Sequence, residues 1–149
     1  AIDMAEHNTI GQQGEKIAAE IMRKKGFRVV ETNWRFGHLE MDIIATNKKE
    51  IAFVEVKTRT STFGNKRPEE YVDLTKKKRM TAAANAYIKM NGIELAPRFD
   101  VIGILLNADT HEVESVNHIE DAFQPPMRTI GRNSFNGQNR WHHRRNVIR

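Results

Sequence analysis

The pattern of hydrophobic and polar residues predicts an α/β fold, with a mixed central β-sheet flanked by helices. Apolar residues recur at helical spacing before residue 26 and again over residues 73–90, which predicts two amphipathic helices. Short runs rich in β-branched and aromatic residues are typical of strands. The predicted order is therefore helix, three strands, helix, two strands. The expected strands cover residues 27–33, 39–46, 51–58, 98–106 and 112–117, with the last at an edge of the sheet.

Local signals delimit the predicted helices. Thr9 followed by Gln12 resembles a capping box, which predicts that the first helix begins there. Gly26 follows the last turn of that helix, and Gly92 follows the last turn of the second, as expected of C-terminal glycines. One more turn of helix is predicted for residues 119–123.

The composition restricts the class of protein. At 149 residues the chain is long enough for one domain with its own core. It has no Cys, which excludes a disulfide framework and a thiolate metal site. No apolar run approaches the roughly 20 residues of a membrane span, and the first residues lack the features of a signal peptide. A soluble, cytoplasmic protein is therefore expected, with no membrane partner.

The formal charge of +5 is unevenly distributed. Residues 124–149 contain six arginines and no acidic residue. Removing those six from the 24 basic residues leaves 18, against 19 acidic ones, so the rest of the chain is close to neutral. We expect a folded domain over residues 1–123, followed by a basic, flexible C-terminal tail over residues 124–149.

Two pairs of charged residues occur in strands that otherwise look buried. Side chains alternate between the faces of a strand, so Glu40 shares a face with Asp42, and Glu55 shares a face with Lys57. Charged groups on such strands are unfavourable unless they are compensated, and a divalent metal and a phosphate would compensate them. Asp42 and Glu55 could supply two ligands to Mg²⁺. Lys57 could orient or deprotonate a metal-bound water, which points to phosphodiester hydrolysis.

Other interpretations of these acids stay open on the residues alone. A half-exposed sheet with acid–lysine pairs across strands would show the same spacing, although the apolar neighbours of Glu55 weigh against it. Glu15 lies at the edge of the apolar stripe of the first helix. It could reach over the sheet as a third carboxylate, or it could be a solvated side chain. Glu40 fits an auxiliary role, or pairing with Arg35 or Lys57, better than direct ligation.

Basic residues follow the acids along the chain. Lys76 and Lys77 lie in the first turn of the second predicted helix, where phosphates are favoured. Lys76 precedes Met80 by one turn, which allows its side chain to point along the sheet. Arg59 and Arg67 lie in or beside the preceding loop. Each is explained equally by an ordinary surface charge, but together they suit a nucleic-acid backbone.

A series of motifs resembles one family in the correct order, through roughly residues 5–123. That family is the YraN-like family of uncharacterised bacterial proteins. It resembles in turn the PD-(D/E)xK, or restriction-endonuclease-like, superfamily, and particularly archaeal Holliday-junction resolvases. The motifs are Gly14-Glu15-Lys16-Ile17-Ala18, Asn33-Trp34-Arg35, Glu40-Met41-Asp42-Ile43-Ile44-Ala45, Phe53-Val54-Glu55-Val56-Lys57-Thr58-Arg59, Phe63-Gly64 and Arg98-Phe99-Asp100-Val101.

The resemblance implies a restriction-endonuclease-like domain over residues 1–123 and a role for four residues. Asp42 matches the metal-binding Asp of the superfamily, Glu55 its second acid and Lys57 its lysine. Glu15 matches the first-helix glutamate of the resolvase-like branch. The implied cofactor is Mg²⁺ or Mn²⁺. Met41 stands where the superfamily often has Pro, which removes no ligand. The basic tail has no counterpart in the family.

The expected function is that of a metal-dependent nuclease that hydrolyses phosphodiester bonds in DNA, with branched or structured DNA among the candidate substrates. DNA is favoured over RNA as the partner. The alternative is a non-catalytic nucleic-acid-binding protein that retains the nuclease fold. A third hypothesis is an interaction protein whose basic tail binds a partner or RNA. A homodimer would suit a two-fold symmetric junction, but the residues carry no interface signature.

Overall fold

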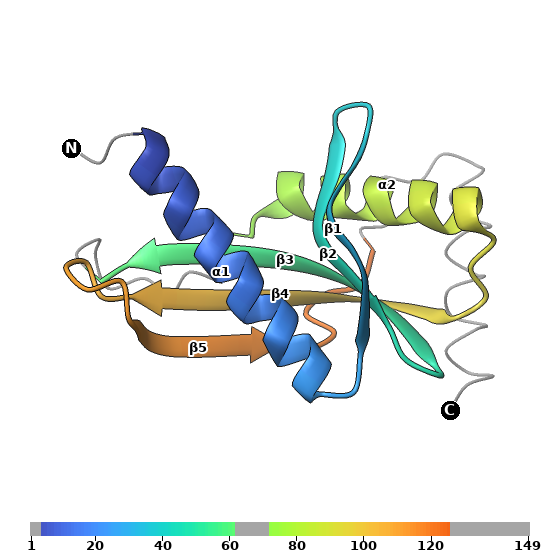
Figure 1. Cartoon of the computed structure of the whole chain (residues 1–149). Helices are drawn as coiled ribbons and strands as arrows, with labels where there is room; N and C mark the ends of the chain where they lie inside the picture. Colours follow the sequence, from blue (N-terminus) through green and yellow to red (C-terminus); the bar gives the residue numbers. More distant parts are fainter. Residues whose placement is uncertain (1–3, 62–71, 126–149) are drawn as a thin grey trace.

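A five-stranded mixed sheet with one helix on each face forms the fold (Figure 1). The computed structural model describes residues 4–61 and 72–125. The order of the elements is the predicted one, and the expected α/β fold is confirmed. The elements are α1 (Met4–Lys24), β1 (Arg28–Phe36), β2 (Leu39–Thr46), β3 (Glu50–Thr60), α2 (Leu74–Asn91), β4 (Ala96–Leu106) and β5 (Val113–Ile119).

The strands lie in the sheet in the order in which they occur along the chain, β1 to β5. Neighbouring strands are antiparallel except for β3 and β4, which are parallel. A parallel pair requires a long crossover, and α2 lies in the connection between β3 and β4. Helix α1 crosses one face of the sheet and α2 lies along the other (Figure 1).

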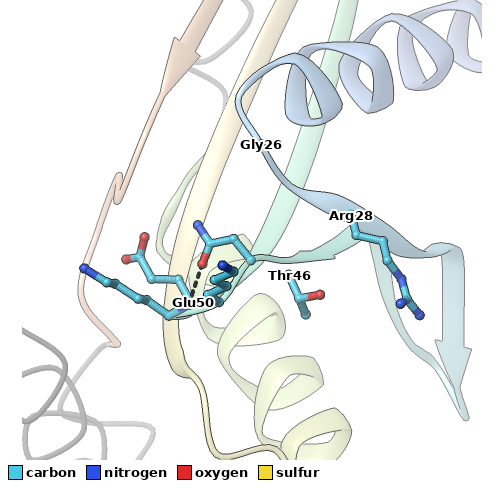
Figure 2. Close-up of a pocket in the computed structure, with 7 residues that line it drawn as sticks. Gly26, Arg28, Thr46 and Glu50 are labelled. Atoms are coloured by element: carbon cyan, nitrogen blue, oxygen red, sulfur yellow. Dashed lines mark hydrogen bonds between the residues drawn. The ribbon is translucent and has the colours of Figure 1, made fainter.

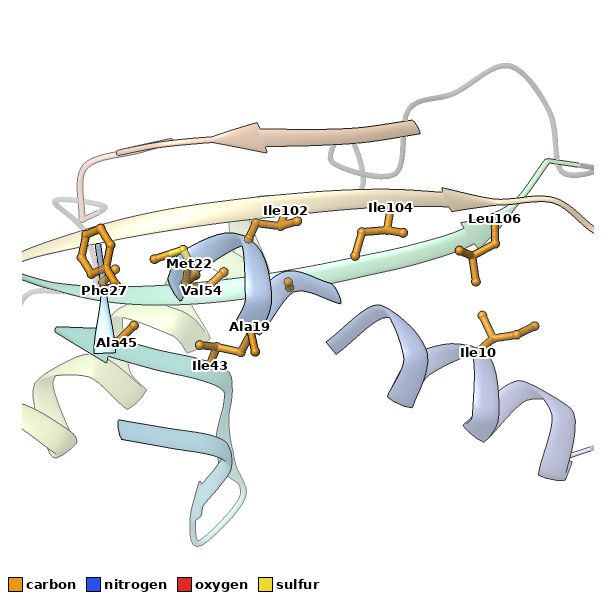
Figure 3. Packing of buried hydrophobic residues seen from close by; sticks show 12 residues of the cluster. Ile10, Ala19, Met22, Phe27, Ile43, Ala45, Val54, Ile102, Ile104 and Leu106 are labelled. Atoms are coloured by element: carbon orange, nitrogen blue, oxygen red, sulfur yellow. The ribbon is translucent and has the colours of Figure 1, made fainter. Parts of the chain in front are cut away.

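Each face of the sheet has its own hydrophobic core, because successive residues of a strand point to opposite faces. Val54, Ile102 and Ile104 pack beneath α1 together with Met22 (Figure 3). Phe53, Phe99 and other large side chains pack beneath α2, on the opposite face. Strands β3 and β4 are therefore buried on both sides. This explains why the sequences of β3 and β4 are nearly continuous runs of apolar residues.

The predicted start of α1 is wrong and its predicted end is confirmed. The helix already begins at Met4, so Thr9 lies inside it instead of capping it. The residues before Thr9 include good helix formers and no helix breaker, so nothing stops the helix from extending toward the N-terminus. At the other end, Gly26 has φ 91°, and Phe27 N–H donates to the Met22 carbonyl at 3.0 Å. This is a Schellman ending, which requires the left-handed conformation that glycine adopts readily.

Helix α2 has a defined cap at each end. The Asp73 carboxylate accepts a hydrogen bond from Lys76 N–H at 2.9 Å, which satisfies one of the unpaired donors of the first turn. Gly92 ends the helix with φ 57°, as its position predicted. The turn of helix predicted for residues 119–123 is wrong, because β5 continues to Ile119. The backbone N–H of Ala122 then donates to Phe99 O instead of forming a helix.

Strand β1 is longer than predicted, and its end forms a protruding hairpin with β2. Asn33 has the left-handed φ of 51°, yet pairing continues past it to Phe36↔Leu39. Pairing between β2 and β3 runs only from Thr46↔Ile51 to Ile43↔Val54, so residues 33–42 extend past the part of β2 that pairs with β3. We call this segment the hairpin tip, and Figure 1 shows its turn standing clear of the body of the sheet.

No helix in the described part of the chain is long and apolar enough to cross a membrane. Nearly all of the basic tail predicted for residues 124–149 lies outside the described residues.

Candidate active site

The two acids singled out in the sequence lie together where β2 and β3 diverge. The last pair of the register is Ile43↔Val54, so the next residues of the two strands are Asp42 and Glu55. The Asp42 carboxylate accepts a hydrogen bond from the Val56 backbone N–H, with 2.8 Å between Oδ2 and N. Glu55 is buried, with 4% of its surface exposed. The divergence of the strands thus brings two carboxylates together at the base of the hairpin tip.

The proximity of these acids changes the protonation of Asp42. Together, burial and the proximity of Glu55 raise the pKa of the Asp42 carboxyl from 3.8 to about 8. Burial contributes most to this rise, the negative charge of Glu55 and a hydrogen bond with it add to it, and the bond from Val56 N–H opposes it. Without a cation, the Asp42 carboxyl therefore favours its protonated form at neutral pH. Perturbed carboxyl groups of this kind are concentrated at functional sites.

Two lysines from different elements contact the same oxygen of Glu55. Lys57 lies two residues along β3, and its Nζ is 3.3 Å from Glu55 Oε2. Lys76 comes from the first turn of α2, and its Nζ is also 3.3 Å from Glu55 Oε2. Both ammonium groups are largely shielded from solvent. The structure therefore places Lys57 as predicted, and brings in Lys76 from a segment about 20 residues further along the chain.

A close contact between α1 and β3 sets the position of Glu15. A Cβ added at Gly14 would overlap the Thr58 hydroxyl, so only glycine allows the helix to lie this close to the strand. Glu15 follows directly, and its charge contributes to the raised pKa of Asp42. It also lines a cavity of about 500 Å³ between α1 and β1, together with Asn33 and other polar residues. Glu15 is thus the third acid near the pair.

The donor set fits a magnesium-like cation better than a transition metal. Hard divalent cations take oxygen ligands, and Mg²⁺ commonly uses one or two carboxylates and completes its shell with water and phosphate. Asp42 and Glu55 supply two carboxylates, and a cation would replace the proton that their proximity favours. Within the described residues, Glu15 does not join them in a group whose ligand atoms all lie within 4.8 Å of one another. Glu15 would therefore contact a cation held by Asp42 and Glu55 through a water molecule.

The remaining charged residues predicted for the site are more widely distributed. Arg59 donates to the backbone carbonyl of Thr58 at 3.0 Å. The Lys77 ammonium lies 5.5 Å from the centre of the Phe123 ring, a cation–π contact, so it does not join Lys76 at Glu55. Arg67 lies outside the described residues. Glu40 pairs with Arg35 at 3.3 Å on the exposed hairpin, which is one of the auxiliary roles expected for it.

A second charged cluster was not singled out as functional in the sequence. Asp100 is fully buried on β4 and accepts from Arg98 at 2.9 Å, and the ring of His118 lies 2.7 Å from it. Asp100, His118 and Glu120 lie close enough together to hold a metal ion. The Arg98 guanidinium, however, already pairs with Asp100 and Glu120 and occupies that position. The signal in the sequence was an Arg and an Asp two residues apart on an apolar strand.

A depression at the β2–β3 turn contains none of the predicted site residues. It has a volume of about 630 Å³ and is lined by Gly26, Arg28, Thr46, Glu50 and the intervening turn. Figure 2 shows the Arg28 side chain pointing away from Glu50, so the charged groups of this depression do not converge on one point. The turn lies five residues along β3 from Glu55, so it is separate from the acids. The candidate active site is therefore the cluster at Asp42 and Glu55.

The sequence of the chain is similar to proteins of one family. A model of the uncharacterised protein family UPF0102 matches residues 14–104. A UPF0102 protein of Bacteroides thetaiotaomicron is 42% identical over 124 residues, covering 83% of this chain and 99% of that protein. A UPF0102 protein of Caldanaerobacter subterraneus subsp. tengcongensis is 44% identical over 117 residues, covering 77% and 94%. The matched residues include Glu15, Asp42, Glu55, Lys57 and Lys76.

Proposed function

This chain belongs to the uncharacterised protein family UPF0102, and we propose that it is a metal-dependent nuclease that hydrolyses phosphodiester bonds in DNA. The observation that carries the proposal is the half-buried Asp42 beside the buried Glu55, with Lys57 and Lys76 both contacting Glu55 Oε2. The proposal includes a restriction-endonuclease-like fold, which the order of elements and the mixed sheet support.

A purely structural role explains this cluster poorly. Asp42 is held in a place where burial and Glu55 raise its pKa to about 8, an unfavourable position for a carboxylate at neutral pH. Hydrophobic residues would stabilise the same strands without that penalty. A divalent cation removes the repulsion between the two carboxylates, and the two ammonium groups then favour an anionic ligand. A phosphodiester has the charge that this combination requires.

Each residue of the site would have its own role in hydrolysis. Asp42 and Glu55 would hold Mg²⁺ or Mn²⁺, and Glu15 would orient water at the edge of the site. A bound cation lowers the pKa of a water molecule and neutralises charge on the phosphate. Lys57 Nζ orients the attacking water through a hydrogen bond and stabilises the negative charge that develops on the phosphate. Lys76 Nζ binds a phosphate oxygen at the start of α2.

The test is cleavage of DNA by the full chain with Mg²⁺ or Mn²⁺ present. Linear duplex, single-stranded and four-way-junction DNA cover the substrate classes. We expect cleavage of at least one, and a loss of about a hundredfold or more in Asp42→Asn and in Lys57→Ala, which remove a metal ligand and the group that orients water. Rates of bond cleavage, measured on labelled strands, give the comparison.

Matched substitutions at exposed positions provide the controls. Asp109→Asn and Lys48→Ala remove the same charges from turns distant from the acids, and they should cleave like the parent chain. Comparable loss in the controls, or failure of the parent chain to cut any of the substrates, would contradict the proposal. Salt-dependent DNA binding that is unchanged in Asp42→Asn, without cleavage, would favour the non-catalytic binding protein instead.

A further inference from the structure

An aromatic ring is exposed at the end of the hairpin tip. Phe36 is 51% exposed, and it is the one aromatic residue among the large hydrophobic side chains that are exposed in the described ranges. It pairs with Leu39 across the hairpin, directly before the turn at Gly37, which has φ 62°. Strand β1 ends at Phe36, and Figure 1 shows the ribbon of β1 and β2 projecting at that end. The exposed part of the ring is therefore accessible to a ligand.

A chain of ring contacts holds Phe36 in place. Its ring stacks on Trp34, with centroids 6.4 Å apart and an interplanar angle of 18°. Trp34 contacts Tyr87 of α2 edge to face at 5.3 Å, and Tyr87 contacts Phe53 of β3 at 6.2 Å. The exposed ring is thus supported from the core on the α2 side of the sheet. A ligand that stacks on it would lose little binding energy to ordering the side chain.

The hairpin sets the distance between this ring and the acids. Asn33 lies opposite Asp42, because it falls between the pairs Thr32↔Ile43 and Trp34↔Met41. Phe36 is three residues further along the strand. At about 3.3 Å per residue, its backbone lies about 10 Å from the position of Asp42. A few nucleotides of a single strand can span this separation.

We propose that Phe36 is a stacking platform for an unpaired nucleobase of the nucleic acid that the acidic site cleaves. The inference rests on the proposed function and deepens it, because it names a structural feature of the substrate. The base that stacks on Phe36 lies within a few nucleotides of the bond that is cut. The protein therefore selects nucleic acid with an unstacked or frayed base at that distance, without reading its sequence.

The size and shape of the hairpin tip favour a base over other ligands. The exposed half of one phenylalanine offers about 100 Å², far below the roughly 800 Å² per partner of a stable protein interface. A convex tip also lacks the concave walls that enclose a small molecule. A nucleobase needs only a flat ring of this area, and such stacking contributes about 1–3 kcal/mol per base.

The experiment uses the full chain with Asp42→Asn, so that bound DNA is not cut. The probe is a single-stranded oligonucleotide of about a dozen nucleotides with 2-aminopurine at one position, moved along the strand in successive probes. Stacking should quench the fluorescence at one position more than at the others. Adding Phe36→Ala should remove this quenching and weaken binding about tenfold or more, whereas Phe36→Tyr should keep both. Val113→Ala trims an exposed apolar residue on β5 and is the matched control.

Each outcome decides the inference separately from nuclease activity. Unchanged binding and quenching in Phe36→Ala would overturn it, as would a dimer of the parent chain that Phe36→Ala converts to monomer. Position-dependent quenching that depends on Phe36 supports the stacking platform even if the parent chain with Mg²⁺ cuts nothing, in which case only the proposed nuclease activity fails. When the parent chain does cut, a cleaved bond many nucleotides from the quenched base would contradict the geometry.

Discussion

At the scale of single residues, the proton near Asp42 and a divalent cation compete for the same two carboxylates. The raised pKa of Asp42 means that the folded, cation-free protein holds a proton that the unfolded chain releases above about pH 4. Both states are protonated well below pH 4, and both are ionised well above pH 8. Between these limits the native state binds more protons, so the contribution of Asp42 to stability decreases as the pH rises.

Asp42→Asn should therefore stabilise the cation-free protein, and more so at pH 8 than at pH 5. The amide oxygen can still accept from Val56 N–H, while the ionisable group is lost. We expect the gain in unfolding free energy to grow by on the order of a few kcal/mol between these pH values, since one pKa unit corresponds to about 1.4 kcal/mol. Urea unfolding in EDTA measures it. An equal gain at both pH values would show that the pKa of Asp42 is not raised as described.

If Asp42 holds a cation, Mg²⁺ should stabilise the parent chain against unfolding at pH 8 but should not stabilise Asp42→Asn.

At the scale of elements, the site depends on how closely α1 crosses β3. The helix places Glu15 near Asp42 only because Gly14 has no side chain to meet Thr58. The helical pattern predicted that Glu15 lies at the edge of the buried stripe. The need for glycine at position 14 was not visible in that pattern, because it arises from a partner more than 40 residues away. The contact thus connects the packing of a helix with the geometry of the acids.

Gly14→Ala should destabilise the fold by about 1–3 kcal/mol, because its Cβ would displace the helix from the strand. Adding Thr58→Ala should recover part of the loss, since it removes the hydroxyl that the new Cβ would overlap. Gly11→Ala, three residues earlier on the same helix, meets nothing within 4 Å and should stabilise by up to about 1 kcal/mol. Denaturant unfolding gives all three values. If Gly14→Ala behaved like Gly11→Ala, the close approach would be wrong.

At the scale of the whole molecule, the buried network around Asp100 joins distant parts of the chain. Arg98 contacts Glu50 from the start of β3 and Glu120 after β5, and it stacks on Phe27 after α1, with its guanidinium carbon 4.7 Å from the ring centre. Asp100 also accepts from the Asp121 backbone N–H at 3.0 Å. The buried pair of Arg98 and Asp100 therefore connects segments from four places in the sequence.

Removing one partner of this network should be more harmful than removing both. Asp100→Ala leaves the Arg98 guanidinium buried without its main partner, and we expect a loss of about 3–5 kcal/mol. The double variant Asp100→Leu with Arg98→Met replaces both charges with apolar groups and should lose less. Thermal or urea unfolding of Asp100→Ala, of the double variant and of its two single changes, Asp100→Leu and Arg98→Met, provides the comparison. A double variant that is as unstable as the sum of the single changes would contradict a coupled pair.

The order of elements, most strand positions and the shared face of Glu55 and Lys57 could be predicted from the sequence, because they depend on local periodicity. Helical spacing predicted that Lys76 can point along the sheet, but its contact with Glu55 depends on how α2 lies on the sheet. The extension of β1 past Asn33 was missed, since a residue typical of turns was accommodated within a strand. The Asp100 network was missed because its partners become neighbours only through the register of β4 and β5.

The strand order also has a consequence for how the chain folds. Ile43 and Val54 pair across 11 residues of sequence, whereas Glu50 and Ala96 pair across 46, so the β2–β3 hairpin closes a far shorter loop than the parallel β3–β4 pair. Short loops cost less entropy to close, and local pairings form sooner than long-range ones. We therefore expect Asp42 and Glu55 to meet before β4 completes the sheet. Repulsion between the two carboxylates should then slow folding as well as reduce the final stability of the protein.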